Sequence, residues 1–282
     1  MKVLITGAGG QLGRDLVLAC EREGDEVVVC DHAALDLGDR HSVMEAITAG
    51  RPDVVINSGA WTAVDACESD PDKAELVNGR GPAFVVEAAE AVGAHVVQIS
   101  TDYVFDGTKI GPYVETDATN PLSAYGRSKL QGEQAVRPTD AVVRTAWVCG
   151  QHGANMVKTV LALADRPELA FVDDQRGSPS FTADLAVTIR RLAADRLSGT
   201  FHVTNQGETT WYGFVRDVLE LAGHDPGKVR PIATADLDPP RPAPRPANSV
   251  LANVALEAVG LPLLPHYRSS LERLLVALGA RA

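Results

Sequence analysis

Residues 2–13, KVLITGAGGQLG, decide the fold. A short run of apolar and β-branched residues is followed by three glycines at a spacing of three, Gly7, Gly10 and Gly13. Helical spacing then begins and extends over 11–23. The first glycine permits a sharp turn, the second lets the backbone approach a pyrophosphate, and the third lets the helix pack against the strand. Because free N–H groups at a helix start attract anions, this βα unit predicts a dinucleotide site.

Apolar strands alternate with helical segments through the first half of the chain. Strands are predicted at 2–6, 26–31, 52–57, 95–100 and 141–148, and helices at 11–23, 42–49, 72–92 and 123–136. Strands that are apolar on both faces and alternate with helices form parallel sheets covered on both sides. Right-handed crossovers then give an α/β fold, a doubly wound parallel (Rossmann) sheet, with a second, smaller α/β substrate lobe.

After residue 150 the alternation becomes irregular. Helices are predicted at 155–164, 182–195, 211–222, 254–259 and 270–278, with one strand at 200–204. We therefore predict that 1–148 form an NAD(P)-binding domain and that 149–282 form mainly a substrate-binding lobe, whose later segments are free to return to the sheet. The stretch 238–246, DPPRPAPRP, has five prolines in nine residues and is expected to be an ordered loop. The acidic run 65–72 is interpreted as a solvated segment.

Composition narrows the classes of partner and the compartment. The chain has 282 residues, with 26 Lys and Arg against 37 Asp and Glu, so its net charge is −11. Such an acidic surface argues against nucleic acid and against an anionic membrane as partners. There is no signal-peptide pattern and no apolar run of ~18 residues, which predicts a cytoplasmic protein. The four cysteines are scattered without metal-ligand spacing, so we expect reduced thiols and no metal site.

A carboxylate ends the second predicted strand. Asp31 lies 24 residues after Gly7, where an acidic side chain can bond the adenosine ribose hydroxyls. A negative charge there would repel the extra phosphate of NADPH and so favours NADH. Arg14 and Arg40 lie near in sequence and can offset that repulsion, so NADH and NADPH both stay open.

A second motif indicates proton transfer. Tyr125 and Lys129 are four residues apart and share one face of a predicted helix. A free tyrosine has a pKa of ~10, and a neighbouring ammonium lowers it. Thr101 follows the strand 95–100, at the sheet edge where ligands of such folds bind, and its hydroxyl can bond a reacting oxygen. Glycine loop, threonine and Tyr-x-x-x-Lys in this order predict a catalytic site rather than a structural role for these residues.

The sequence resembles the dTDP-4-dehydrorhamnose reductase family of the extended short-chain dehydrogenases/reductases. The resemblance is carried by GAGGQLG (7–13), RPDVVINSGAWTAVDACES (51–69), STDYVFDG (100–107), NPLSAYGRSKLQGE (120–133), RTAWVCG (144–150), DQRGSPSFTADLA (174–186) and RPANSVL (245–251). It extends from residue 2 to about residue 275. STDYVFDG, RTAWV and RPxNS are specific to this family rather than to short-chain dehydrogenases at large.

The resemblance implies a role for each matching residue. Tyr125 would protonate the C4 oxygen of a sugar ketone, and Lys129 would hold the nicotinamide ribose and lower the pKa of the tyrosine. Thr101 would bond the same oxygen, while Asp102 and Trp147 would contact the sugar. Cofactor contacts are implied for Gly7, Gly10, Gln11, Leu12, Asp31, Asp36, Leu37, Ala60, Trp61, Thr62, Ile99, Tyr125 and Lys129. Arg245 is the candidate for the substrate diphosphate, because a guanidinium grips phosphate oxygens bidentately. Trp211 is interpreted as a packing residue.

The implied reaction is NAD(P)H-dependent reduction of the C4 ketone of dTDP-4-dehydro-L-rhamnose to dTDP-L-rhamnose, the last step of dTDP-rhamnose biosynthesis. Two alternatives stay open: reduction of another dTDP-4-keto-6-deoxy sugar in secondary metabolism, and a non-catalytic, cofactor-binding regulatory subunit. Some family members bridge a homodimer through Mg²⁺ with a glutamate where this chain has Asp15. No partner cluster accompanies Asp15, so the sequence does not support Mg²⁺, while a homodimer stays open.

Overall fold

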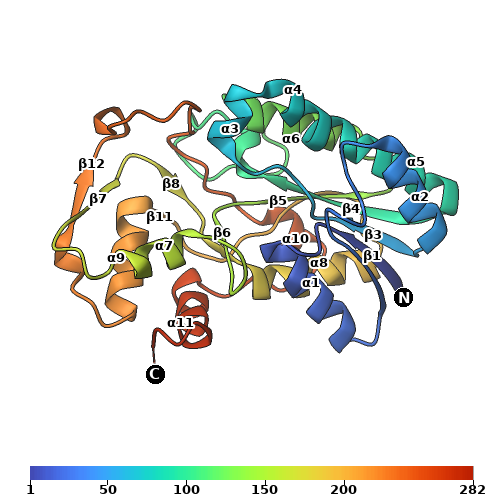
Figure 1. The fold of residues 1–282 in the computed structure, drawn as a ribbon. Coiled ribbons are helices and arrows are strands. Elements are labelled where there is room, and N and C mark those ends of the chain that lie inside the picture. The colour runs from blue at the N-terminus through green and yellow to red at the C-terminus, as the bar shows by residue number, and fades with distance from the viewer. Residues whose placement is uncertain (282) are drawn as a thin grey trace.

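A six-stranded parallel sheet forms the centre of the larger part of the molecule (Figure 1). The computed structural model describes residues 1–281. The spatial order is β2-β1-β3-β4-β5-β10. The strands are β1 (Lys2–Thr6), β2 (Glu26–Cys30), β3 (Val54–Asn57), β4 (His95–Thr101), β5 (Ala141–Thr145) and β10 (Gly199–His202). Every neighbouring pair in this sheet is parallel, which confirms the doubly wound α/β fold.

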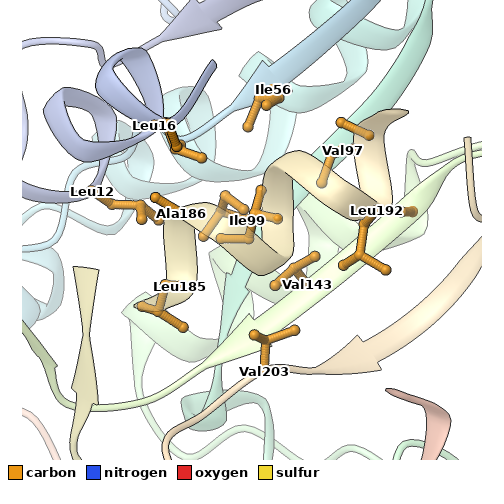
Figure 2. Close-up of a cluster of buried hydrophobic side chains, with 14 of the residues drawn as sticks. Leu12, Leu16, Ile56, Val97, Ile99, Val143, Leu185, Ala186, Leu192 and Val203 are labelled. Atoms are coloured by element: carbon orange, nitrogen blue, oxygen red, sulfur yellow. The ribbon is translucent and has the colours of Figure 1, made fainter. Parts of the chain in front are cut away.

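Helices cover both faces of the sheet because its strands are apolar on both sides. On one face lie α1 (Gln11–Arg22), α8 (Thr182–Ala194) and α10 (Val254–Ala258), and on the other lie α2 (Arg40–Gly50) and α5 (Gly81–Val92). Side chains alternate between the faces along each strand, so Val3 and Ile5 pack toward α1 and α8 while Leu4 packs toward α2 and α5. Figure 2 shows α8 placing Leu185 and Leu192 in the first of these cores.

The segment predicted as one helix over 72–92 has three parts. These are α4 (Pro71–Ala74), the π-helical η1 (Glu75–Arg80) and α5. The next α-helix in the chain, α6 (Ala124–Gln134), comes after β4. Most of the acidic run 65–72 is solvated, as expected from its charge: Asp70 and Asp72 are exposed, and the side chain of Asp65 is 42% exposed. The run begins within α3 (Val64–Ser69), and Asp65 is engaged with Arg245 from the far end of the chain. Charge composition alone did not indicate this partner.

A smaller lobe follows β5. Its helices are α7 (Met156–Ala162), α9 (Trp211–Leu221) and α11 (Tyr267–Ala277). Its strands form three two-stranded ladders: β6 (Val148–Cys149) with β9 (Ser180–Phe181), β7 (Leu169–Val172) with β12 (Val229–Ile232), and β8 (Arg176–Gly177) with β11 (Thr209–Thr210). The lobe also has the short 3₁₀ turns η3 (Pro226–Lys228) and η4 (Thr234–Asp236), whereas a third such turn, η2 (Asp102–Val104), directly follows β4 of the large sheet. The lobe has its own apolar core, which includes Phe214 and Leu271.

Two segments of the later half return to the sheet. β10 pairs with β5, and α8 packs on α1, although both come from the range 149–282. The division into 1–148 and 149–282 stays a prediction, and so does its provision that later segments return to the sheet of the first domain. The proline-rich stretch 238–246 forms no helix or strand, as expected. Within residues 1–281, no helix is both long and apolar enough to span a membrane.

Candidate active site

A cavity of about 840 Å³ runs along the carboxyl ends of the parallel strands and reaches the smaller lobe. Most of the residues implied for cofactor or sugar contact line it. These are Gly7, Gly10, Gln11, Leu12, Asp31, Ala60, Thr62, Ile99, Thr101, Asp102, Tyr125, Lys129 and Trp147. Segments that are far apart in sequence thus meet at the edge where open α/β sheets bind ligands.

The glycine loop forms one end of the cavity. Gly7 has φ +62°, and a Cβ there would lie 2.6 Å from the Cα of Gly59. A Cβ on Gly13 would lie 2.2 Å from the carbonyl oxygen of Gly7, so α1 can pack this closely only without a side chain. No side chain caps the first N–H groups of α1. This cradle of backbone N–H groups fits a diphosphate, and therefore the dinucleotide predicted from the spacing.

Asp31 lies just beyond β2, at the same end of the cavity. Its Oδ1 accepts hydrogen bonds from the backbone N–H groups of Ala33 and Ala34, each at 3.0 Å. These bonds orient the carboxylate at the wall of the cavity, where Asp31 and its neighbour His32 both lie. A ribose hydroxyl placed there would meet a fixed acceptor.

Tyr125 and Thr101 meet in the middle of the cavity wall. Tyr125 lies in the first turn of α6, which starts where the side chain of Ser123 accepts from the N–H of Gly126. Burial raises the pKa of Tyr125 above its usual range, although a hydrogen bond with Thr101 opposes the shift. Tyr103 packs edge-on against the Tyr125 ring, with ring centroids 5.7 Å apart. The phenol therefore stays protonated at neutral pH, as a proton donor requires.

Lys129 lies one turn after Tyr125 and is only 4% exposed. Its Nζ donates to the carbonyl oxygen of Ile99 at 2.7 Å. Burial lowers the pKa of Lys129 to about 8, against an opposing effect of Glu133. The expectation that this ammonium lowers the pKa of Tyr125 stays a prediction, while desolvation is the largest cause of the net rise in the pKa of the phenol.

Asp102 is buried beside Thr101, whose hydroxyl donates to its Oδ1 at 2.9 Å. Burial raises the pKa of Asp102 to about 6, and its hydrogen bonds only partly offset that rise. The carboxyl group therefore changes charge just below neutral pH. It does so at the wall of the cavity, next to the hydroxyl that would bond the substrate oxygen.

Two tryptophans close the end of the cavity in the smaller lobe. Trp147 lies between β5 and β6 with φ +47°, which ends the strand that was predicted to continue to residue 148. Trp211, at the start of α9, stacks on it with centroids 3.6 Å apart and planes 5° apart. Trp211 packs, as interpreted from the sequence, and it also lines the cavity.

Four of the implied residues do not line the cavity. Asp36 accepts from the N–H of Gly38, and Leu37 is buried in the core under α2 and α5. Trp61 lies under the Lys73 ammonium, which is 4.6 Å from its ring centroid. Arg245 is 7% exposed at its side chain and forms a bidentate pair with Asp65, both contacts at 2.7 Å. Their roles stay predictions, and a diphosphate role for Arg245 would require that pair to open.

Several residues in the cavity wall were not singled out from the sequence. Tyr103, Thr145 and Ser58 all line it. Tyr103 and Thr145 lie inside STDYVFDG and RTAWVCG, so motif membership was the available signal. No sequence signal placed Trp211 in the cavity wall, because only the packing of the smaller lobe brings it against Trp147. In the part of the chain that the structure describes, no three His, Cys, Asp or Glu side chains lie together as a metal site.

The fold and this site define an NAD(P)-dependent oxidoreductase with the short-chain dehydrogenase/reductase architecture. The family described as the RmlD substrate binding domain matches residues 1–279. A dTDP-4-dehydrorhamnose reductase of Streptomyces griseus is 44% identical, over 99% of this chain and 94% of the relative. A dTDP-4-keto-6-deoxy-D-glucose reductase of Streptomyces niveus is 40% identical, over 98% and 97%.

Solved structures of dTDP-4-dehydrorhamnose reductases share this fold. The dTDP-4-dehydrorhamnose reductase of Bacillus anthracis in complex with NADP superposes with a TM-score of 0.93 at 36% identity, covering 98% of both chains. The chain belongs to the RmlD family of dTDP-4-keto sugar reductases.

Proposed function

We propose that this protein reduces the C4 ketone of dTDP-4-dehydro-L-rhamnose with NAD(P)H, giving dTDP-L-rhamnose in the last step of dTDP-rhamnose biosynthesis. The observation that carries the proposal is the meeting of Thr101, Tyr125 and Lys129 in one cavity with the glycine loop. The same cavity ends at the stacked indoles of Trp147 and Trp211, which give its sugar end an apolar lining.

The cofactor would lie along the glycine loop and Asp31. A bound nicotinamide cofactor supplies the hydride that reduces the ketone carbon. Gln11 and Leu12 would present backbone N–H groups to its diphosphate, while the N–H of Gly10 donates to the carbonyl oxygen of Gly7 and holds the turn. Lys129 would hold the ribose next to the nicotinamide. Asp31 favours NADH, whereas the B. anthracis relative is described with NADP. We therefore keep both cofactors in the proposal.

The proton comes from Tyr125 in this proposal. Its phenol O–H donates to the C4 oxygen as negative charge develops there. The Thr101 hydroxyl, which donates to Asp102 Oδ1 in the ligand-free structure, would turn to donate to the same C4 oxygen. Burial favours the neutral phenol, so the proton is available at neutral pH. Asp102 and Trp147 would orient the sugar, so that the ketone faces these two donors.

The experiment is turnover of freshly made dTDP-4-keto sugar by the purified protein, followed as oxidation of NADH or NADPH. Formation of dTDP-L-rhamnose supports the proposal. A product with another configuration at C4 would support the second candidate, a reductase of a different dTDP-4-keto-6-deoxy sugar, which the S. niveus relative favours. Cofactor binding without turnover would instead indicate the regulatory role. Cytoplasmic location and a homodimer stay predictions.

A further inference from the structure

A polar row crosses three strands beneath the site. On the sheet face that packs against α2 and α5, Leu4, Val55 and Val96 lie side by side in β1, β3 and β4. The next positions on that face, toward the carboxyl edge, are Thr6, Asn57 and Gln98. All three are buried, and Gln98 is 1% exposed. Burying a polar side chain costs free energy of desolvation unless it is hydrogen-bonded. Three such side chains at positions that elsewhere on this face are apolar therefore require an explanation.

The three side chains pass hydrogen bonds in a single direction. The N–H of Gly59 donates to Thr6 Oγ1 at 3.2 Å, and that hydroxyl donates to Asn57 Oδ1 at 2.5 Å. Asn57 Nδ2 donates to Gln98 Oε1 at 2.6 Å. Gln98 Nε2 then donates to the carbonyl oxygen of Ile99 at 2.8 Å. Each link sets the orientation of the next amide, because an amide has one donor end and one acceptor end.

The row ends on the oxygen that holds Lys129. The Ile99 carbonyl accepts both from Gln98 Nε2 and from Lys129 Nζ, at 2.7 Å from the ammonium. At its other end the row begins at Gly59, whose Cα lies against Gly7 of the glycine loop. The hydrogen bonds thus connect the floor of the dinucleotide site with the lysine of the Tyr-x-x-x-Lys pair.

We infer that Gln98 is a positioning residue, whose amide fixes the Ile99 carbonyl as the anchor of the Lys129 ammonium. This inference rests on the proposed function for its kinetic consequence. Two donors share one acceptor, so the positive end of the Gln98 amide also opposes the charge on Lys129. The charged group that acts on Lys129 from its own helix is Glu133, which is held by Arg144 of β5 and Ser100 of β4. Tyr103, Tyr125 and Asp102 are titratable groups of the adjoining cavity wall.

The test is Gln98→Met, which keeps the length of the side chain and removes its donor and acceptor. The chain has six lysines, so the Cε signal of Lys129 can be assigned by NMR of lysine-labelled, ligand-free protein. The expected result is a rise of about half a unit or more in the pKa of Lys129, because the opposing amide dipole is gone. Turnover should fall ~10-fold with little change in KM for the nucleotide sugar, since Gln98 does not line the cavity.

Thr204→Val is the matched control. Thr204 is also fully buried and its hydroxyl pairs with Asn253, away from Lys129. It should lower thermal stability without moving the pKa of Lys129 or kcat. If Gln98→Met behaves like this control, the row only holds strands together and the inference is overturned.

A second variant keeps the inference testable if Gln98→Met does not fold. Thr6→Val removes the hydroxyl that fixes the Asn57 amide, so this amide can turn over. The orientation of the Gln98 amide is then lost from the Thr6 end of the row. A raised pKa of Lys129 in this variant supports the inference, and an unchanged pKa rejects it. A wild-type protein that fails to reduce any dTDP-4-keto sugar would reject the proposed function instead, while the lysine titration would still decide the role of Gln98.

Discussion

The indole of Trp147 stacks on the indole of Trp211, with ring centroids 3.6 Å apart and planes within 5°. Trp147 follows β5 of the large sheet, and Trp211 opens α9 of the smaller lobe, so the pair joins the two parts at the cavity. Gly177 also lies against Trp147, where a Cβ would lie 2.4 Å from indole Cε2. The indole therefore has close neighbours in both a ring and a backbone.

Gly177→Ala should displace this indole. The added methyl overlaps Trp147, so the sugar end of the cavity changes shape and we expect KM for the nucleotide sugar to rise ~10-fold, with a smaller change in kcat. Steady-state kinetics and tryptophan fluorescence measure the two effects. Gly111→Ala is the control, because a Cβ there has no neighbour within 4 Å. Equal kinetics for both variants would show that Trp147 does not shape the sugar site.

Tyr125→Phe should lower kcat by ~10²-fold or more, because it removes the proton donor while keeping the ring. Binding of NADH, measured by fluorescence titration, should change little. Tyr212→Phe serves as the control, since the Tyr212 hydroxyl contacts Arg216 on α9. Wild-type turnover in Tyr125→Phe would exclude Tyr125 as the donor.

Lys129→Met should abolish turnover and stabilise the fold. Burial lowers the pKa of Lys129 to about 8 from 10.5, so below pH 8 the folded state holds a charge that it disfavours. Between about pH 8 and 10.5 the unfolded chain binds the extra proton, so wild-type stability contributed by this group rises with pH. We expect Lys129→Met to be more stable by roughly 1–3 kcal/mol at pH 7, with the difference shrinking toward pH 10.5. Denaturant unfolding at several pH values measures it, and a constant difference would contradict it.

Arg245→Ala and Asp65→Asn separate two roles of one ion pair. If Arg245 binds the substrate diphosphate, Arg245→Ala should raise KM for the nucleotide sugar ~10-fold or more, whereas Asp65→Asn frees the guanidinium and should leave KM unchanged or lower. Both variants should lose some stability, because the pair pins α3 to the proline-rich loop. Equal KM values in the two variants and the wild type would assign Arg245 to the loop alone.

Asp31→Ala should raise the ratio of kcat/KM for NADPH to that for NADH by about 10-fold, because it removes a negative charge at the cavity wall. Its hydrogen bonds to the N–H groups of Ala33 and Ala34 are lost as well, so thermal unfolding should be measured in parallel. Asp39→Ala, which removes a comparable carboxylate that accepts from His41, is the control. An unchanged ratio would mean that Asp31 does not contact the adenosine ribose of the cofactor.

The elements of the sheet could be predicted closely, because each strand is a local apolar run and each helix has local periodicity. The exceptions are positions where tertiary contacts override the local pattern. Trp147 adopts φ +47° against Gly177 and Trp211, which ends β5 early. The helix predicted over 72–92 contains a π-helical turn whose Asn78 holds the backbone of Trp61 through two hydrogen bonds. Neither contact has a signal in its own segment.

By itself, the amino-acid sequence determined the parallel sheet, the glycine loop and the place of Thr101, Tyr125 and Lys129 at one edge, because the alternation of strands and helices and the i, i+4 spacing are properties of local sequence. Only the tertiary structure decided the charge state of those groups and the partners of Lys129, Asp65 and Arg245. Burial depends on what packs around a side chain, and in this cavity desolvation outweighs the effect of the neighbouring ammonium on the phenol.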